Sequence, residues 1–126
     1  MRDGSHISLI ALGDMLSHTL LAADSLRKEG IFADVIDMHT IKPIDEDLVL
    51  SSARKTGRVV TVEDHQIIGG LGSAIAEVLS EKHPALLYRI GLRNTFAESG
   101  QYHLLLDKYE MSENHIVAAA RRLLKR

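Results

Sequence analysis

Apolar and polar residues follow two different periods along this chain, and the period changes most sharply between residues 58 and 82. Val59, Val60 and Val62 belong to a β-branched run that is typical of a strand covered on both faces. After a group of glycines, apolar residues recur at helical spacing, at Leu71, Ala74, Ile75, Val78 and Leu79. We therefore predict a strand, a tight turn and an amphipathic helix within this one segment.

The same alternation extends over most of the chain. Further strands are predicted over 7–12, 31–38 and 86–92, and further helices over 15–29, from an Asp45 cap to about 55, and from Ser112 onward. A short helix is expected over 104–109, and residues 93–102 form the longest predicted loop. Strands that alternate with helices and are apolar on both faces predict an α/β fold, a three-layer α/β/α sandwich around a mainly parallel sheet.

Composition narrows the class of protein. A chain of 126 residues with 45% hydrophobic residues is expected to form a single domain, 1–126, with its own core. The net charge of -2 comes without a basic stripe, which argues against a nucleic-acid partner. No apolar run approaches the ~18 residues of a membrane span, so we expect no membrane partner. The absence of cysteine excludes disulfides and a cysteine nucleophile, and it is compatible with a cytoplasmic location.

Two interpretations of the glycine turn at Gly69, Gly70 and Gly72 remain open. Backbone amides at a helix start can bind an anion such as a phosphate. However, the turn lacks the spacing of dinucleotide sites and the lysine of a P-loop. The favoured interpretation is that the glycines let the helix pack closely against the strand.

Glu63, Asp64 and His65 are expected at the carboxyl end of a parallel strand, the edge where open α/β sheets usually place their sites. A carboxylate beside an imidazole can act as a base or bind a metal. Successive residues of a strand point in different directions, and no second ligand at metal spacing is nearby. We therefore favour a structural or interface role for these three residues.

Several stretches taken together resemble the carboxyl-terminal domain of transketolase, most closely the small subunit of split transketolases. They occur in the family's order, and related domains are found in 1-deoxyxylulose-5-phosphate synthase and in the β subunit of 2-oxo acid dehydrogenases. The stretches are Leu-Ile-Ala-Leu-Gly at 9–13, Ile-Lys-Pro-Ile-Asp at 41–45, Val-Thr-Val-Glu-Asp-His at 60–65, Gly-Gly-Leu-Gly-Ser-Ala at 69–74, Ile-Gly-Leu at 90–92 and Phe-Ala-Glu-Ser-Gly at 96–100.

The resemblance implies a chain that is part of an enzyme. In such enzymes thiamine diphosphate and Mg²⁺ are held by a diphosphate-binding and a pyrimidine-binding domain, and the complete enzyme transfers two-carbon ketol units between sugar phosphates. Neither domain is present here, so no catalytic, cofactor-binding or metal-binding residue is carried over. The implied partners are those two domains or subunits, in a homo- or hetero-oligomer. Residues 1–6 resemble the linker that leads from the pyrimidine-binding domain.

The resemblance also implies a role in assembly and subunit contacts. We place the contact surface at the glycine turn and the 93–102 loop, because both follow strand ends. The candidate interface or anion-binding residues are Glu63, Asp64, His65, Gly69, Gly70, Gly72, Phe96, Ser99 and Gly100. A bulky residue at Gly72, or Ala97→Arg, is expected to impair docking and to leave the isolated fold mostly intact.

The sequence is therefore compatible with three functions. The first is an assembly domain of a thiamine-diphosphate transketolase. The second is a free-standing regulatory module whose Gly69–Gly72 turn binds an anion or a nucleotide. The third is a small independent enzyme that uses Glu63, Asp64 and His65, and its weakness is the missing cofactor apparatus.

Overall fold

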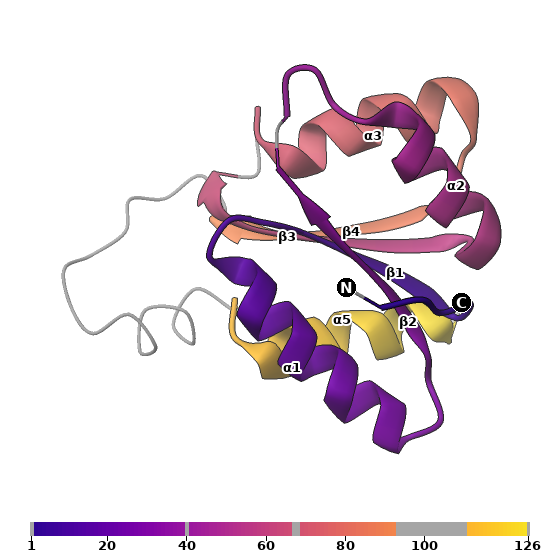
Figure 1. Cartoon of the computed structure of the whole chain (residues 1–126), viewed down its shortest axis with the longest axis vertical. Coiled ribbons are helices and arrows are strands. Elements are labelled where there is room, and N and C mark those ends of the chain that lie inside the picture. Colours follow the sequence, from indigo (N-terminus) through magenta and orange to yellow (C-terminus); the bar gives the residue numbers. More distant parts are fainter. Residues whose placement is uncertain (1, 40, 67–68, 93–110, 126) are drawn as a thin grey trace, which may run out of the picture.

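The computed structural model describes residues 2–39, 41–66, 69–92 and 111–125, without the side chains of 65 and 66. Strands and helices alternate along the chain up to β4 (Figure 1). In chain order they are β1 (Ile7–Leu12), α1 (Met15–Lys28), β2 (Ala33–Met38), α2 (Glu46–Thr56), β3 (Arg58–Gln66), α3 (Leu71–Lys82), β4 (Leu86–Leu92) and α5 (Glu113–Leu124). The short helix predicted over 104–109 lies outside the described residues.

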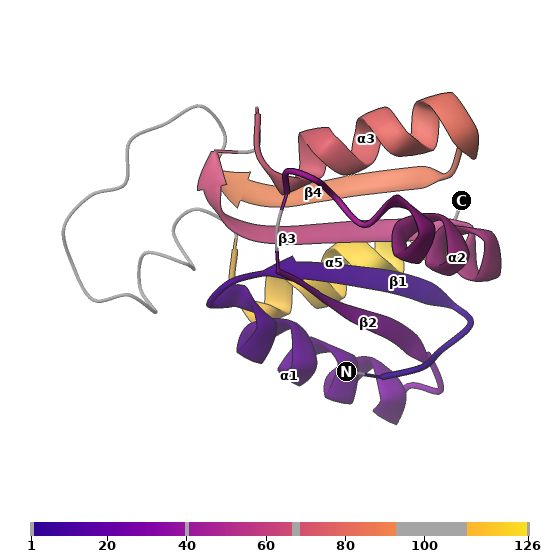
Figure 2. The ribbon, with the colours of Figure 1, turned by 45° about the horizontal axis from the view of Figure 1, so that its top comes forward.

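The four strands form one sheet in the order β2-β1-β3-β4, and every pair of neighbours is parallel (Figure 2). Leu9 pairs with Val35 on one side and with Val60 on the other. The pairing of β3 with β4 shifts register between Val62 and Gln66. All carboxyl ends therefore meet at one edge, next to the start of α3.

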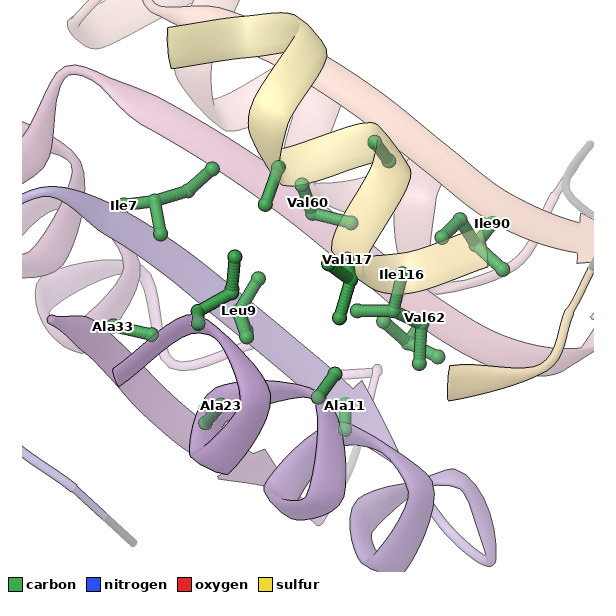
Figure 3. Close-up of a cluster of buried hydrophobic side chains, with 14 of the residues drawn as sticks. Ile7, Leu9, Ala11, Ala23, Ala33, Val60, Val62, Ile90, Ile116 and Val117 are labelled. Carbon is green, nitrogen blue, oxygen red and sulfur yellow. The ribbon is translucent and has the colours of Figure 1, made fainter. Parts of the chain in front are cut away.

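Two helical layers cover the sheet, with α1 and α5 on one face and α2 and α3 on the other (Figure 1). Each face carries its own apolar core. On the first face, Val60 and Val62 of β3 lie next to α5, and Leu9 of β1 lies between α1 and α5, as Figure 3 shows. The three-layer sandwich predicted from the alternation of strands and helices is confirmed.

Both cores draw on the same strands, because successive side chains of a strand point to opposite faces. In β1, Leu9 packs toward α1 and α5, whereas Ile10 packs toward α2 and α3, and both are fully buried. In β3, Val60 and Val59 divide in the same way. This explains why the strand sequences are apolar in continuous runs.

Local signals set the bounds of α2. Asp45 Oδ1 accepts a hydrogen bond of 3.1 Å from the Leu48 amide, so the predicted cap is confirmed. Gly57 ends the helix in the left-handed region at φ 73°, a conformation that glycine adopts without strain.

Across the described residues, no helix is both long and apolar enough to cross a membrane.

Candidate functional site

The segment that the sequence singled out lies at the carboxyl edge of the sheet, where β3 ends and α3 begins. Helix α3 starts with Gly70 at its N-cap, in an extended conformation. Glycine has no side chain with which to accept hydrogen bonds from the first amides of the helix. A different residue must therefore satisfy them.

Glu63 supplies that acceptor from inside β3. Its side chain is fully buried, with Oε1 accepting from the Leu71 amide at 2.9 Å and Oε2 from the Gly72 amide at 2.8 Å. A carboxylate at this position also lies at the positive end of the helix dipole. The strand thus caps the helix that follows it, and the intervening turn is fixed at both ends.

The glycines on either side of that cap serve different purposes. Gly69 has φ +81°, and its amide donates to Ser73 Oγ at 3.0 Å. A Cβ at Gly72 would lie 2.7 Å from Arg89 Cδ and 3.0 Å from Thr61 Oγ1, so this glycine allows α3 to pack closely on β3 and β4. The close-packing interpretation is supported at Gly72.

This geometry corrects one expectation about Gly72. A bulky residue there would meet Arg89 and Thr61 inside the domain, so it would disturb the fold itself and not only a docking surface. The companion variant at Ala97 lies outside the described residues.

The anion-binding alternative is not favoured. The amides of Leu71 and Gly72, which would have received an anion, already donate to the Glu63 carboxylate. A phosphate would have to displace a fully buried carboxylate that accepts two hydrogen bonds. The anion at this helix start is therefore one of the protein's own side chains.

The structure brings Glu63 and the glycine turn together, and of the remaining candidate residues it describes only Asp64 with its side chain. Asp64 follows Glu63 in β3 and is half-buried, whereas the His65 side chain is outside the described part of the molecule. Phe96, Ser99 and Gly100 also lie outside the described residues. Glu63 does not fit the role of a solvent-accessible base, because it is fully buried and accepts from two amides.

Sequence reasoning missed a groove beside the glycine turn, which we call the turn groove. It has a volume of about 380 Å³ and lies between the 41–46 segment and the first turns of α3. Half-buried Ile41, Ile44 and Ala74 contribute its apolar lining, and Lys42 and Glu77 lie at its exposed rim. The Ile-Lys-Pro-Ile-Asp stretch and the Gly-Gly-Leu-Gly-Ser-Ala stretch, far apart in sequence, therefore share one surface.

An ion pair closes the far end of that surface. Lys82 Nζ in α3 lies 3.0 Å from Glu46 Oε1 in α2, and the Glu46 carboxylate raises the pKa of Lys82. Among the described residues, no group of three or more His, Cys, Asp or Glu side chains could hold a metal ion. The turn groove thus combines an apolar lining, from Ile41, Ile44 and Ala74, with charged residues at its rim. Such a surface is suited to contact with another protein.

Comparison with known proteins gives a consistent result. A family described as the C-terminal domain of transketolase matches residues 1–116. The 6-deoxy-6-sulfo-D-fructose transketolase subunit of Clostridium sp. (strain MSTE9) is 45% identical over 126 residues, which are 100% of this chain and 39% of that protein. The 1-deoxy-D-xylulose-5-phosphate synthase of Heliobacterium modesticaldum is 38% identical over 124 residues, which are 98% of this chain and 19% of that protein.

A solved structure is similar over nearly the whole fold. It is described as a split gene transketolase in an inactive β4 tetramer, and it superposes with a TM-score of 0.94 at 46% identity. The match covers 98% of this chain and 41% of that chain. This chain thus spans about two fifths or less of the proteins that it matches.

Proposed function

Because the chain belongs to the family of transketolase C-terminal domains, we propose that it is the assembly and subunit-contact domain of a thiamine-diphosphate-dependent transketolase. The complete enzyme would transfer two-carbon ketol units between sugar phosphates. The observation that carries the proposal is the match of residues 1–116 to this family, in a chain that is 39% of the length of a transketolase subunit. The remaining parts of such an enzyme would supply the chemistry.

Thiamine diphosphate and Mg²⁺ belong, in this proposal, to the other domains. The described residues offer no cluster suited to a metal, and Glu63, the carboxylate buried at the candidate site, is committed to two backbone amides. The residues that the structure describes therefore offer no site that fits the cofactor. The chain's contribution is to position the cofactor-binding domains, in a cytoplasmic homo- or hetero-oligomer.

We place the contact surface at the carboxyl edge of the sheet, on the turn groove and the glycine turn beside it. The Glu63 cap holds the start of α3 in one position, which gives a partner a preformed surface. Half-buried Ile41 and Ile44 provide apolar area, and the charges of Lys42 and Glu77 provide orientation. The regulatory-module alternative has no comparable support, because the amides it needs are occupied.

A pair of matched variants tests this placement. Ala74→Arg puts a long charged side chain into the turn groove, whereas Ala118→Arg puts the same side chain at an exposed position of α5, on the opposite face of the sheet. We expect Ala74→Arg to weaken binding to a chain carrying the two cofactor-binding domains by at least about tenfold, or roughly 1.4 kcal/mol. Titration calorimetry measures the affinity, and Ala118→Arg should bind as the parent does.

The result that would contradict the placement is equal affinity for both variants, with far-UV circular dichroism unchanged.

Binding of inorganic phosphate separates the second function, the regulatory module, from the first, the assembly domain. Saturable amide shifts from Gly69 to Ser73 on phosphate titration would favour the regulatory module.

A further inference from the structure

Helix α3 forms one wall of the turn groove, and that wall carries an unusual charge pattern. From the second turn onward, the residues of α3 that line the groove are Ala74, Glu77, Val78 and Glu81. Their spacing of three or four residues puts them on one face of the helix. Apolar and acidic side chains therefore alternate along the wall, with two exposed carboxylates one helical turn apart.

The charges around the groove leave an excess of carboxylate. Glu46 of α2 pairs with Lys82 of the neighbouring α3 at 3.0 Å and raises the pKa of Lys82, so these two charges compensate each other (Figure 1). Across the described part of the chain, no ion pair involves Glu77 or Glu81. Beside the Glu46–Lys82 pair, the described lining residues therefore comprise one cation, Lys42, and two carboxylates.

The physics of an isolated helix disfavours these two carboxylates. Glu77 and Glu81 are four residues apart, a spacing at which like charges repel each other. Glu81 also lies in the last turn of α3, at the negative end of the helix dipole, where cations are favoured. Residues that break such local rules are expected at functional sites. A cation supplied by a binding partner would relieve both conflicts.

We propose that the turn groove receives a protein segment in which an apolar side chain is flanked by lysine or arginine. The apolar side chain packs among Ile41, Ile44 and Val78, and the cation reaches the carboxylates of Glu77 and Glu81. This inference rests on the proposed function, and it adds the chemistry of the segment by which the cofactor-binding chain docks. The same carboxylates repel an acidic segment, so they contribute to the choice of partner.

Titration calorimetry with two charge-matched variants tests the proposal. Glu77→Gln/Glu81→Gln removes two negative charges from the groove, whereas Leu21→Lys/Ala118→Lys adds two positive charges at exposed positions across the sheet. The titrant is the chain that carries the diphosphate- and pyrimidine-binding domains. In about 0.1 M salt, charges more than ~10 Å away are largely screened. We expect the glutamine variant to bind about three- to tenfold more weakly than the parent, and the lysine variant to bind as the parent does.

Salt and stability provide two further measurements on the glutamine variant. Its difference in affinity from the parent should disappear near 1 M salt, where the Debye length is about 3 Å. Its urea midpoint should equal or exceed that of the parent, because the repulsion at the end of α3 is removed. A lower midpoint would assign the carboxylates a structural role and would overturn the inference. Glu77→Ala/Glu81→Ala replaces the glutamine variant if that protein fails to fold.

The remaining outcomes separate the inference from the function on which it rests. If the glutamine variant binds as tightly as the parent at both salt concentrations, the inference is wrong and the proposed function stands. Tighter binding by the glutamine variant would show that the groove favours an acidic segment, which is equally fatal to the inference. If the parent chain does not bind the titrant, the proposed function is contradicted, and the inference fails with it.

Discussion

At the scale of single residues, one buried carboxylate decides how α3 begins. Glu63 caps a helix whose N-cap, Gly70, has no side chain of its own. The sequence placed Glu63 at the carboxyl edge but grouped it with Asp64 and His65, its neighbours along the chain. Its bonding partners lie eight and nine residues away, across a turn whose path no local pattern specifies. The location was therefore predictable, and the role was not.

Replacing Glu63 by Gln tests the capping role. The glutamine side chain keeps one acceptor oxygen, but its NH2 group replaces the other oxygen and cannot accept a hydrogen bond. One of the two buried backbone amides, that of Leu71 or of Gly72, therefore loses its acceptor. We expect the free energy of unfolding to fall by about 1–3 kcal/mol in urea denaturation. Glu77→Gln, at an exposed position of the same helix, should change it by less than about 0.5 kcal/mol. Equal stability of the two variants would mean that Glu63 does not cap α3.

Gly72→Ala tests the close approach of α3 to the sheet. Alanine favours a helix by about 1 kcal/mol over glycine, but its Cβ would lie 2.7 Å from Arg89 Cδ. We expect the overlap to outweigh the propensity and to lower the free energy of unfolding by about 1–3 kcal/mol. Ser80→Ala, on the exposed side of the same helix, should be neutral or slightly stabilising. A more stable Gly72→Ala protein would show that Arg89 yields without cost.

At the scale of helices and strands, the hydrophobic pattern was a sufficient guide wherever a strand is apolar on both faces. The pattern of 86–92 gave the bounds of β4, Leu86–Leu92, as the structure has them. It gave only the apolar part of β3, which continues through polar residues to Gln66. Gln66 pairs with Leu92 of β4. The sequence analysis placed the carboxyl end of this strand at Glu63, Asp64 and His65, and pairing with β4 extends it by one residue to Gln66.

The link between α1 and α5 should depend on pH. Arg121 Nη2 lies 2.6 Å from Glu29 Oε2, just beyond the end of α1, and the guanidinium lowers the pKa of Glu29. A depressed pKa in the folded state stabilises the protein above the ordinary pKa of 4.5, and this contribution is lost as pH falls through the lowered value.

Glu29→Gln removes that contribution. We expect the variant to lose less stability than the parent between pH 5 and acid conditions, when urea midpoints are compared at each pH. The difference should shrink at high salt, because the pair is exposed. Parallel pH profiles of the two proteins would rule out the ion pair as a source of acid sensitivity.

At the scale of the whole molecule, the four-stranded sheet carries one apolar core on each of its two faces. The sequence predicted this architecture because alternating strands and helices allow few arrangements. It could not predict the turn groove or the pairing of residues 2–6 with β2, since both arise from segments distant along the chain. Residues 2–6, which resemble an interdomain linker, pair with β2 through contacts that depend on Gly4 and Asp34.

Ketol transfer, measured with and without a second chain, tests the central claim most directly. The purified chain is mixed with thiamine diphosphate, Mg²⁺, a ketose phosphate and an aldose phosphate, and the new sugar phosphate is quantified. We predict no transfer by this chain alone, and transfer that saturates as a chain with the diphosphate- and pyrimidine-binding domains is added. Transfer by the purified chain in the absence of any other protein would contradict an assembly role.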